Sequence, residues 1–406
     1  MHLYPAAMEP LLPGAGKRLS SLKAKSLEVI RESAALGAML HPVTRQALVE
    51  LLHKMNSYYS NLIEGHNTHP TAIERALIRD YAAEPAKRAL QEESVAHIQV
   101  QRRMEERLAA EPSLEICEPE FLCWLHREFY SRLPEEFHSV EQHDGARVLI
   151  VPGTLRTSGV RVGRHFAPLS DSLPSFLERF AKAYSPARFD DVDRILAAAA
   201  SHHRLLWIHP FLDGNGRVTR LFTHAYLHRA RIDGHGLWAA TRGLARRREE
   251  YVAALADADE PRRGDLDGRG NLSERGLTDF CEFFLDTALD QIRFMREVLD
   301  LDGVQERVLR FAELAAGRGE VRIEAGFLLR DVVLRGEIAR GEAARITGLG
   351  TRSAQALVAE LVRKRLLVSE TPKGPLRLGL PPSAVAYYFP RLYPEGIEAG
   401  MRTSTH

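Results

Sequence analysis

One segment of this chain, residues 207–220, constrains its fold most, because one helix must end and a second must begin inside it. His209 precedes Pro210 and is therefore pushed out of the helical region, which ends the first helix. The run Gly214-Asn215-Gly216 then lies just before the second helix. Side chains at helical spacing support both helices: Ile195, Ala199, His202 and Leu206 in the first, and Val218, Leu221, Phe222 and Ala225 in the second.

The loop between these helices carries groups that suit a phosphate chain beside a metal ion. The amides of residues 214–216 lie at a helix N-terminus, where unpaired N–H groups and the helix dipole favour an anion. Arg217 and Arg220 are one turn apart and can point at the same phosphates. Asp213 is a hard oxygen ligand that suits Mg²⁺, and His209 can accept a hydroxyl proton at neutral pH. A Walker-type NTPase is disfavoured, because no Gly-Lys-Ser/Thr ending follows.

This segment resembles the signature of the Fic family of nucleotidyl transferases, His-x-Phe-x-Asp/Glu-Gly-Asn-Gly-Arg-x-x-Arg, at every fixed position. The resemblance implies transfer of AMP from ATP to a Ser, Thr or Tyr hydroxyl of a protein, with release of pyrophosphate. It implies these roles: His209 as the general base, Phe211 as the anchor of the loop in the core, Asp213 as the Mg²⁺ ligand, Gly214, Asn215 and Gly216 as the cradle of the α- and β-phosphates, Arg217 at the β-phosphate and Arg220 at the γ-phosphate.

A second motif lies upstream, at residues 60–65. An apolar stripe from Leu48 to Leu62 predicts a helix that Gly65 ends, so Ser60 and Glu64 share one face. This motif resembles the inhibitory helix of Fic proteins that carry it N-terminal to the active loop. The resemblance implies an ion pair between Glu64 and Arg220 where the γ-phosphate would lie, and hence low basal activity. Some such members also use the glutamate to align a water that removes AMP, which stays open here.

A short β-hairpin is predicted at residues 156–163, because the residues alternate and glycines flank them. In Fic proteins a hairpin before the active loop forms a flap that pairs with an extended target segment. The residues expected in this flap are Arg156, Thr157, Val160, Val162 and Gly163.

Two residues downstream, Tyr251 and Asp259, are candidates for the adenine pocket, since the family often places an aromatic and a polar side chain there. A tyrosine at helical spacing can equally belong to the core. Residues 265–273 look like a calcium loop, but they lack the glutamate at the twelfth position and instead predict a turn.

Composition indicates an ordinary soluble protein of 406 residues, with 45% hydrophobic content and a net charge of +1. Residues 1–13 lack the pattern of a signal peptide, and no run is long enough to span a membrane. We therefore expect a cytoplasmic protein without a membrane partner. The three cysteines lack metal-ligand spacing and fit reduced thiols: Cys117, Cys123 and Cys281.

The C-terminal part resembles a winged helix-turn-helix. A short helical piece at residues 342–346 and a helix capped by Thr351 precede two strands, at residues 366–370 and 376–378. Residues 335–380 hold nine basic and four acidic residues, which favours DNA as a partner. A dimerisation or docking module is the alternative, and a homodimer stays open.

The expected fold is mainly α, a Fic-type helical bundle with a β-hairpin flap and a C-terminal winged helix. The expected function is an autoinhibited protein adenylyltransferase that uses ATP as co-substrate, Mg²⁺ as cofactor and a protein as substrate. The alternatives are AMP removal or another phosphate-containing transfer at the same site, and a DNA-binding transcriptional regulator that senses ATP. Three parts are expected: residues 1–110 as the N-terminal helical region with the inhibitory helix, 111–300 as the catalytic core, and 301–406 as the winged-helix module and tail.

Overall fold

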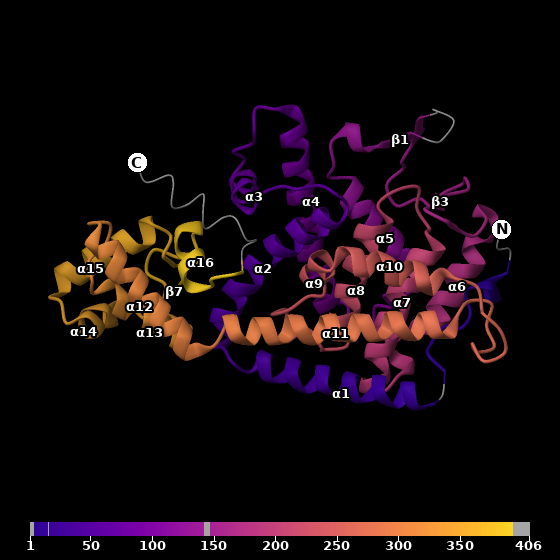
Figure 1. Cartoon of the computed structure of the whole chain (residues 1–406). Coiled ribbons are helices and arrows are strands. Elements are labelled where there is room, and N and C mark those ends of the chain that lie inside the picture. The colour runs from indigo at the N-terminus through magenta and orange to yellow at the C-terminus, as the bar shows by residue number, and fades with distance from the viewer. Residues whose placement is uncertain (1–3, 15, 142–146, 393–406) are drawn as a thin grey trace. The chain divides into compact units, whose positions relative to one another are not determined.

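The structure is a computed structural model that describes residues 4–14, 16–141 and 147–392, and it is mainly helical, as predicted (Figure 1). No helix among the described residues is long and apolar enough to cross a membrane. The three-part domain division stays a prediction. The chain forms two compact units, each described by itself below: residues 1–34 with 56–292, and residues 35–55 with 293–406.

The first unit is built around two consecutive helices, α7 (Asp191–Ile208) and α8 (Asn215–Arg229). The Asp190 side chain accepts a hydrogen bond from the Asp193 N–H (2.8 Å) and so caps the start of α7. Residues 197–200 of α7 are all alanine and fully buried, which lets neighbouring helices approach closely. The predicted helix pair and the break between its members are confirmed.

Further helices of the first unit surround this pair. They are α3 (Pro70–Leu77), α4 (Pro85–Ala110), α5 (Pro119–Tyr130), α6 (Leu173–Tyr184), α9 (Thr241–Arg246) and α10 (Arg248–Asp259), together with most of α1 (Lys17–Gly37) and α11 (Glu274–Val298) and the end of α2 (Pro42–Ile63). Short 3₁₀ turns lie at Pro5–Met8, Glu135–Phe137, Ser170–Ser172 and Pro186–Arg188.

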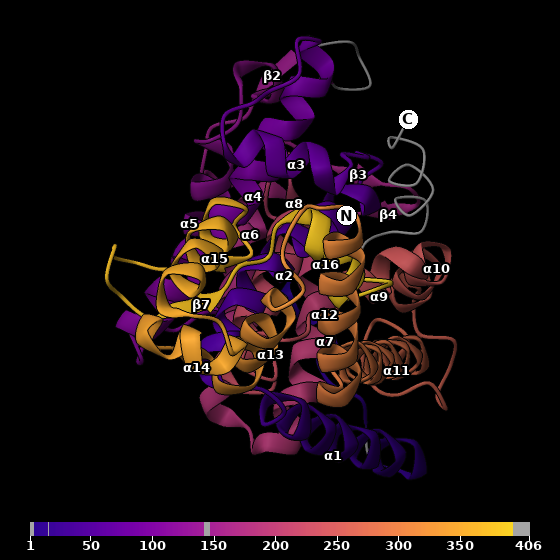
Figure 2. The same cartoon turned by 90° about the vertical axis from the view of Figure 1, so that its left-hand side faces the viewer.

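Helices α1 and α11 run side by side in the first unit (Figure 1, Figure 2). Lys25 forms ion pairs with Glu282 (2.9 Å) and Asp286 (2.7 Å), and Arg18 pairs with Asp279. Exposed pairs of this kind contribute about 0–1 kcal/mol each. The apolar residues of α11 that are buried in the first unit, which include Leu277, contribute more to stability than these surface pairs.

Two antiparallel hairpins precede α6, namely β1 (Ser139–Glu141) with β2 (Arg147–Leu149) and β3 (Arg161–Val162) with β4 (His165–Phe166). The predicted flap is thus displaced, because the hairpin covers residues 161–166 and not 156–163. Arg156 and Thr157 lie outside it. Arg156 is buried, its side chain donates to backbone carbonyls, and its backbone N–H donates to the Pro210 carbonyl instead of to a neighbouring strand.

The second unit contains helices and a three-stranded antiparallel sheet of order β5-β7-β6. The predicted strand pair is present as β6 and β7, and β5 adds to it by pairing with β7. The predicted cap at Thr351 is wrong, since Gly350 is the N-cap and Thr351 is already helical. Besides most of α2, the elements of this unit are α12 (Leu301–Gly317), α13 (Ala325–Arg335), β5 (Glu337–Ile338), a 3₁₀ turn (Arg340–Glu342), α14 (Ala343–Thr347), α15 (Thr351–Arg363), β6 (Leu367–Val368), β7 (Leu376–Leu378) and α16 (Pro382–Tyr388).

Candidate active site

The loop after α7 begins with His209, whose backbone is left-handed with a φ of 50°. This conformation is uncommon for residues other than glycine and often marks a functional position. The ring Nδ1 lies 3.2 Å from the Leu206 carbonyl, and a proton donated from Nδ1 to that oxygen leaves Nε2 as an acceptor. Burial lowers the pKa of His209 to about 4. The ring is therefore neutral at pH 7 and can accept a proton there.

Phe211 and Asn215 brace the loop from inside. The Phe211 ring is fully buried and stacks on His126, with ring centroids 4.2 Å apart, so the predicted anchor in the core is present. The Phe211 N–H donates to Asn215 Oδ1 (2.9 Å), and Asn215 Nδ2 donates to the Phe211 carbonyl (2.8 Å). The Asn215 side chain thus holds the loop closed, and its backbone N–H lies in the first turn of α8, where the predicted phosphate role would need it.

Arg156 also holds this loop in place, through hydrogen bonds to its backbone, and the sequence did not reveal this role. Its side chain is 4% exposed, and burial lowers its pKa to about 10. The guanidinium donates to the carbonyls of His209 (2.7 Å), Ser158 (2.9 Å) and Pro168 (2.6 Å). In addition, the Arg156 N–H donates to the Pro210 carbonyl (3.0 Å). Nothing in the residue pattern near Arg156 indicates these distant partners.

The N-terminus of α8 has the geometry of an anion site. Gly214 adopts a φ of 78° as the N-cap, and a side chain there would collide with the Tyr130 ring. The N–H groups of the first turn have no acceptor within the helix. A side chain at Gly216 would overlap the Glu64 carboxylate. An internal anion therefore lies directly over the start of α8.

Glu64 is held at this position by Arg220. Arg220 Nη2 donates to Glu64 Oε1 (2.6 Å) and to the Ser60 carbonyl (3.0 Å), and its Nε donates to Ser60 Oγ (3.0 Å). Burial would raise the pKa of Glu64, but Arg220 and Arg217 together hold it below its ordinary value. Gly65 follows with a φ of 90°. The contact predicted between Glu64 and Arg220 is present, although Glu64 lies in the turn after α2.

The other arginine of the motif, Arg217, also pairs with a carboxylate of the chain. Its Nη1 donates to Oε1 of Glu93 on α4, and Glu93 is fully buried. His66 Nδ1 lies 2.7 Å from the other oxygen of that carboxylate. Arg217 Nη2 lies 3.5 Å from Asp213 Oδ2, which accepts a hydrogen bond from the Tyr130 hydroxyl (2.7 Å). Sequence reasoning missed Glu93 and His66, because a buried glutamate on a helix has no distinctive local pattern.

Asp213 was the predicted metal ligand. Among the described residues, no group of three or more His, Cys, Asp or Glu side chains could hold a metal ion. The Asp213 side chain is 43% exposed, so it can serve as a single ligand. Mg²⁺ commonly takes one or two carboxylates and completes its shell with substrate phosphates and water. The role of Asp213 as a metal ligand stays a prediction.

The two candidates for the adenine pocket have internal partners. The Tyr251 hydroxyl lies 2.7 Å from His202 Nε2, and Tyr251 is buried. Asp259 pairs with His203 at 3.1 Å, and this partnership contributes to a lowered Asp259 pKa although burial opposes it. The structure thus favours a core position for Tyr251.

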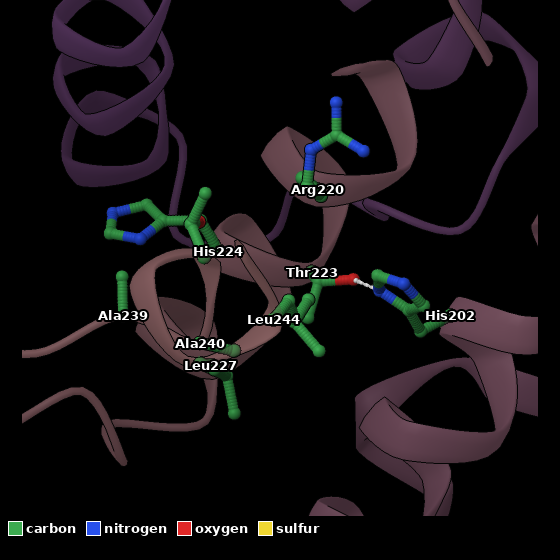
Figure 3. Close-up of a pocket in the computed structure, with 9 residues that line it drawn as sticks. His202, Arg220, Thr223, His224, Leu227, Ala239, Ala240 and Leu244 are labelled. Atoms are coloured by element: carbon green, nitrogen blue, oxygen red, sulfur yellow. Dashed lines mark hydrogen bonds between the residues drawn. The ribbon is translucent and has the colours of Figure 1, made fainter. Parts of the chain in front are cut away.

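A small pocket lies beside Arg220 (Figure 3). His202 and Thr223 form a hydrogen bond across it (2.7 Å), and His224 is bonded to Glu105 (2.9 Å). The polar side chains of His202, Thr223 and His224 in this pocket therefore already have partners within the chain. Its lining residues are His202, Arg220, Thr223, His224, Leu227, Ala239, Ala240, Thr241 and Leu244.

Comparison with known proteins agrees with this geometry. Residues 116–227 match the model of the Fic/DOC family. A protein adenylyltransferase Fic from Nematostella vectensis is 29% identical over 173 residues, which cover 43% of this chain and 37% of the relative. One from Drosophila melanogaster is 36% identical over 78 residues, covering 19% and 16%. The chain thus spans well under half the length of these relatives.

Solved structures show the same fold. A Fic family protein from Desulfovibrio desulfuricans superposes with a TM-score of 0.52 at 18% identity, covering 90% of this chain and 98% of that one. A Fic domain-containing signalling protein from Bacteroides thetaiotaomicron gives a TM-score of 0.50 at 17% identity, covering 68% and 97%.

Proposed function

We propose that this chain is an autoinhibited protein adenylyltransferase, which moves AMP from ATP to a Ser, Thr or Tyr hydroxyl of a protein, and the match of residues 116–227 to the Fic/DOC family model supports this proposal. One observation carries the proposal: an anion site at the start of α8, with a neutral histidine on the same loop, is covered by an internal carboxylate. The relatives named protein adenylyltransferase Fic support this choice of reaction.

The reaction follows from these groups. The target hydroxyl oxygen attacks the α-phosphorus, and His209 Nε2 accepts its proton. The bond from the α-phosphorus to the bridging oxygen breaks, so pyrophosphate leaves with its electron pair. The backbone amides of Gly214, Asn215 and Gly216 and the guanidinium groups of Arg217 and Arg220 stabilise the phosphate oxygens.

Two further groups have supporting roles in this proposal. Asp213 would hold Mg²⁺, which neutralises charge on the phosphates when it is bound. The β3–β4 hairpin, which contains Val162 and Gly163 and directly follows Val160, would pair with an extended target segment and aim its hydroxyl. Contact of Tyr251 and Asp259 with adenine stays a prediction.

Labelled ATP tests the reaction. The Glu64→Gly variant should incorporate label from [α-³²P]ATP into protein and none from [γ-³²P]ATP, and mass spectrometry should find an added AMP. His209→Ala in that background should abolish transfer and preserve ATP binding, whereas His69→Ala, at an exposed cap of α3, should change neither. Label from the γ-phosphate would indicate a kinase instead. Loss of AMP from modified protein on adding the wild type would support the reverse reaction.

DNA binding by the second unit is a separate candidate function. Glu342 pairs with Arg335 and Arg345, and Arg377 pairs with Glu337 and Glu370. None of these residues lies on α15. Arg352, Ser353 and Gln355 at the start of α15 are exposed, as the N-terminal residues of a DNA-reading helix must be. Fluorescence anisotropy with random duplex DNA should give a salt-dependent affinity that Arg352→Ala weakens. A salt-independent or absent signal would favour a docking module.

A further inference from the structure

The buried carboxylate of Glu93 stands apart from the inhibitory contact and from the residues of the motif. It lies on α4, 124 positions from Arg217, and it is fully buried. Both its oxygens are engaged, one by Arg217 Nη1 and the other by His66 Nδ1. A buried charge of this kind survives only when it is paired and hydrogen-bonded. The Glu93 carboxylate is therefore held in one position, and it restrains the side chains of Arg217 and His66 in turn.

The Arg217 guanidinium is held at only one end. Its Nη1 is bound to Glu93, and within the described chain its Nε has no hydrogen-bond partner although it is buried. Its Nη2 has only a long contact, 3.5 Å, with Asp213 Oδ2. The ring of Phe129 lies 5.3 Å from the guanidinium carbon and limits its movement on one face. Nη2 thus keeps a donor that a phosphate oxygen can use, whereas Nε is a buried donor without a partner among the described residues.

We infer that Glu93 is a positioning residue for nucleotide binding: it holds Arg217 ready for a phosphate and keeps it away from Asp213. Without the Glu93 charge, the nearest carboxylate to Arg217 is Asp213, already within ion-pair distance. Arg217 would then pair with the proposed magnesium ligand, and the site would lose a phosphate donor and a metal ligand together. This inference rests on the proposed function, because it assigns the residues to nucleotide phosphates.

His66 connects the Glu93–Arg217 pair to the turn after α2 that carries Glu64. It lies two residues after Glu64, and its N–H donates to the Asn61 carbonyl (2.9 Å), which closes the turn after α2. One turn of chain therefore contacts both arginines, Arg220 directly through Glu64 and Arg217 through His66 and Glu93. Movement of this turn would change both phosphate contacts together.

Glu93→Gln in the Glu64→Gly background tests the inference. Gln keeps the size of the side chain and removes its charge, so the KM for ATP should rise about tenfold or more while kcat changes less. Equilibrium binding of ATP to the same variants carrying His209→Ala, with and without Mg²⁺, should weaken in parallel. Glu105→Gln is the matched control, because Glu105 lies on the same helix, is bonded to His224 and should leave both measurements unchanged.

Two outcomes would overturn the inference. Unchanged ATP binding would make Glu93 a purely structural partner, and tighter ATP binding would make it a competitor of the nucleotide. If Glu93→Gln fails to fold, His66→Ala serves instead, with a smaller rise in KM expected and an unchanged KM refuting the role. If the Glu64→Gly protein itself binds no ATP, the proposed function fails before Glu93 is tested.

Discussion

Replacing Glu64 with glycine should activate the protein, since this removes the anion that covers the start of α8. Glu64 and Arg220 are joined by a charge-assisted hydrogen bond of 2.6 Å. Bonds to charged groups contribute about 1.5–3 kcal/mol, which corresponds to about 10- to 150-fold in an equilibrium constant. The Glu64 side chain is 33% exposed, so water weakens the pair and the lower end of this range applies. We expect auto-labelling to rise at least about tenfold at limiting ATP.

The variant should keep its fold. Arg220 retains its hydrogen bonds to Ser60 Oγ and to the Ser60 carbonyl, both 3.0 Å, so it is not left as an unpaired buried donor. Loss of this partly exposed ion pair should cost no more than about 1.5 kcal/mol, the same lower end of the range. Thermal unfolding followed by circular dichroism should therefore show a shift of only a few degrees.

The assay compares wild type, Glu64→Gly and Glu64→Gln with [α-³²P]ATP at several ATP concentrations. The Gln side chain fills the same space and its oxygen still accepts from Arg220, so its gain should fall between the other two proteins. Equal labelling by wild type and Glu64→Gly, with both proteins folded and binding ATP, would refute inhibition by Glu64. An equal gain for Gln and Gly would show that the charge of Glu64, and not its occupancy of the site, is responsible.

Local signals in the sequence predicted much of the fold around the site. Asp190 caps α7, His209-Pro210 ends it, and Gly65 ends the turn after α2, because each position has a backbone requirement that few residues satisfy. The pairing of Glu64 with Arg220 was predicted from resemblance alone. Their spacing predicted that Ser60 and Glu64 lie on one face of a helix. It could not identify Arg220 as their partner, because Arg220 lies 156 positions from Glu64.

The residues that hold the active loop in place could not be predicted, because their contacts with residues distant in the sequence produce no periodic pattern. Arg156 was expected in the flap, yet it is buried against the carbonyls of the active loop. Glu93 looks like any helical glutamate, and only the folded chain brings it to Arg217. A polar side chain in the core is fixed by its distant partner, whereas apolar periodicity reports only which face of an element is buried. The sequence therefore predicted the residues of the loop itself better than it predicted the residues that hold the loop in place.

Two further changes test how the loop is held and how its histidine works. Arg156→Met should lower the free energy of unfolding by about 3 kcal/mol or more, because the buried carbonyls of His209, Ser158 and Pro168 lose their donor. Urea unfolding with the exposed Arg164→Met as control checks this, and a loss below about 1 kcal/mol would mean that water replaces the guanidinium. The pH dependence of transfer tests His209. A base acts only in its neutral form, so activity is kept above its pKa and lost as the pH falls through it. Since burial lowers that pKa to about 4, the rate of Glu64→Gly should stay level from about pH 8 to about pH 5 and fall below that. An ordinary histidine would lose half its activity near about pH 6.5, and an acid limb there, with the protein still folded, would show that His209 is solvated during the reaction.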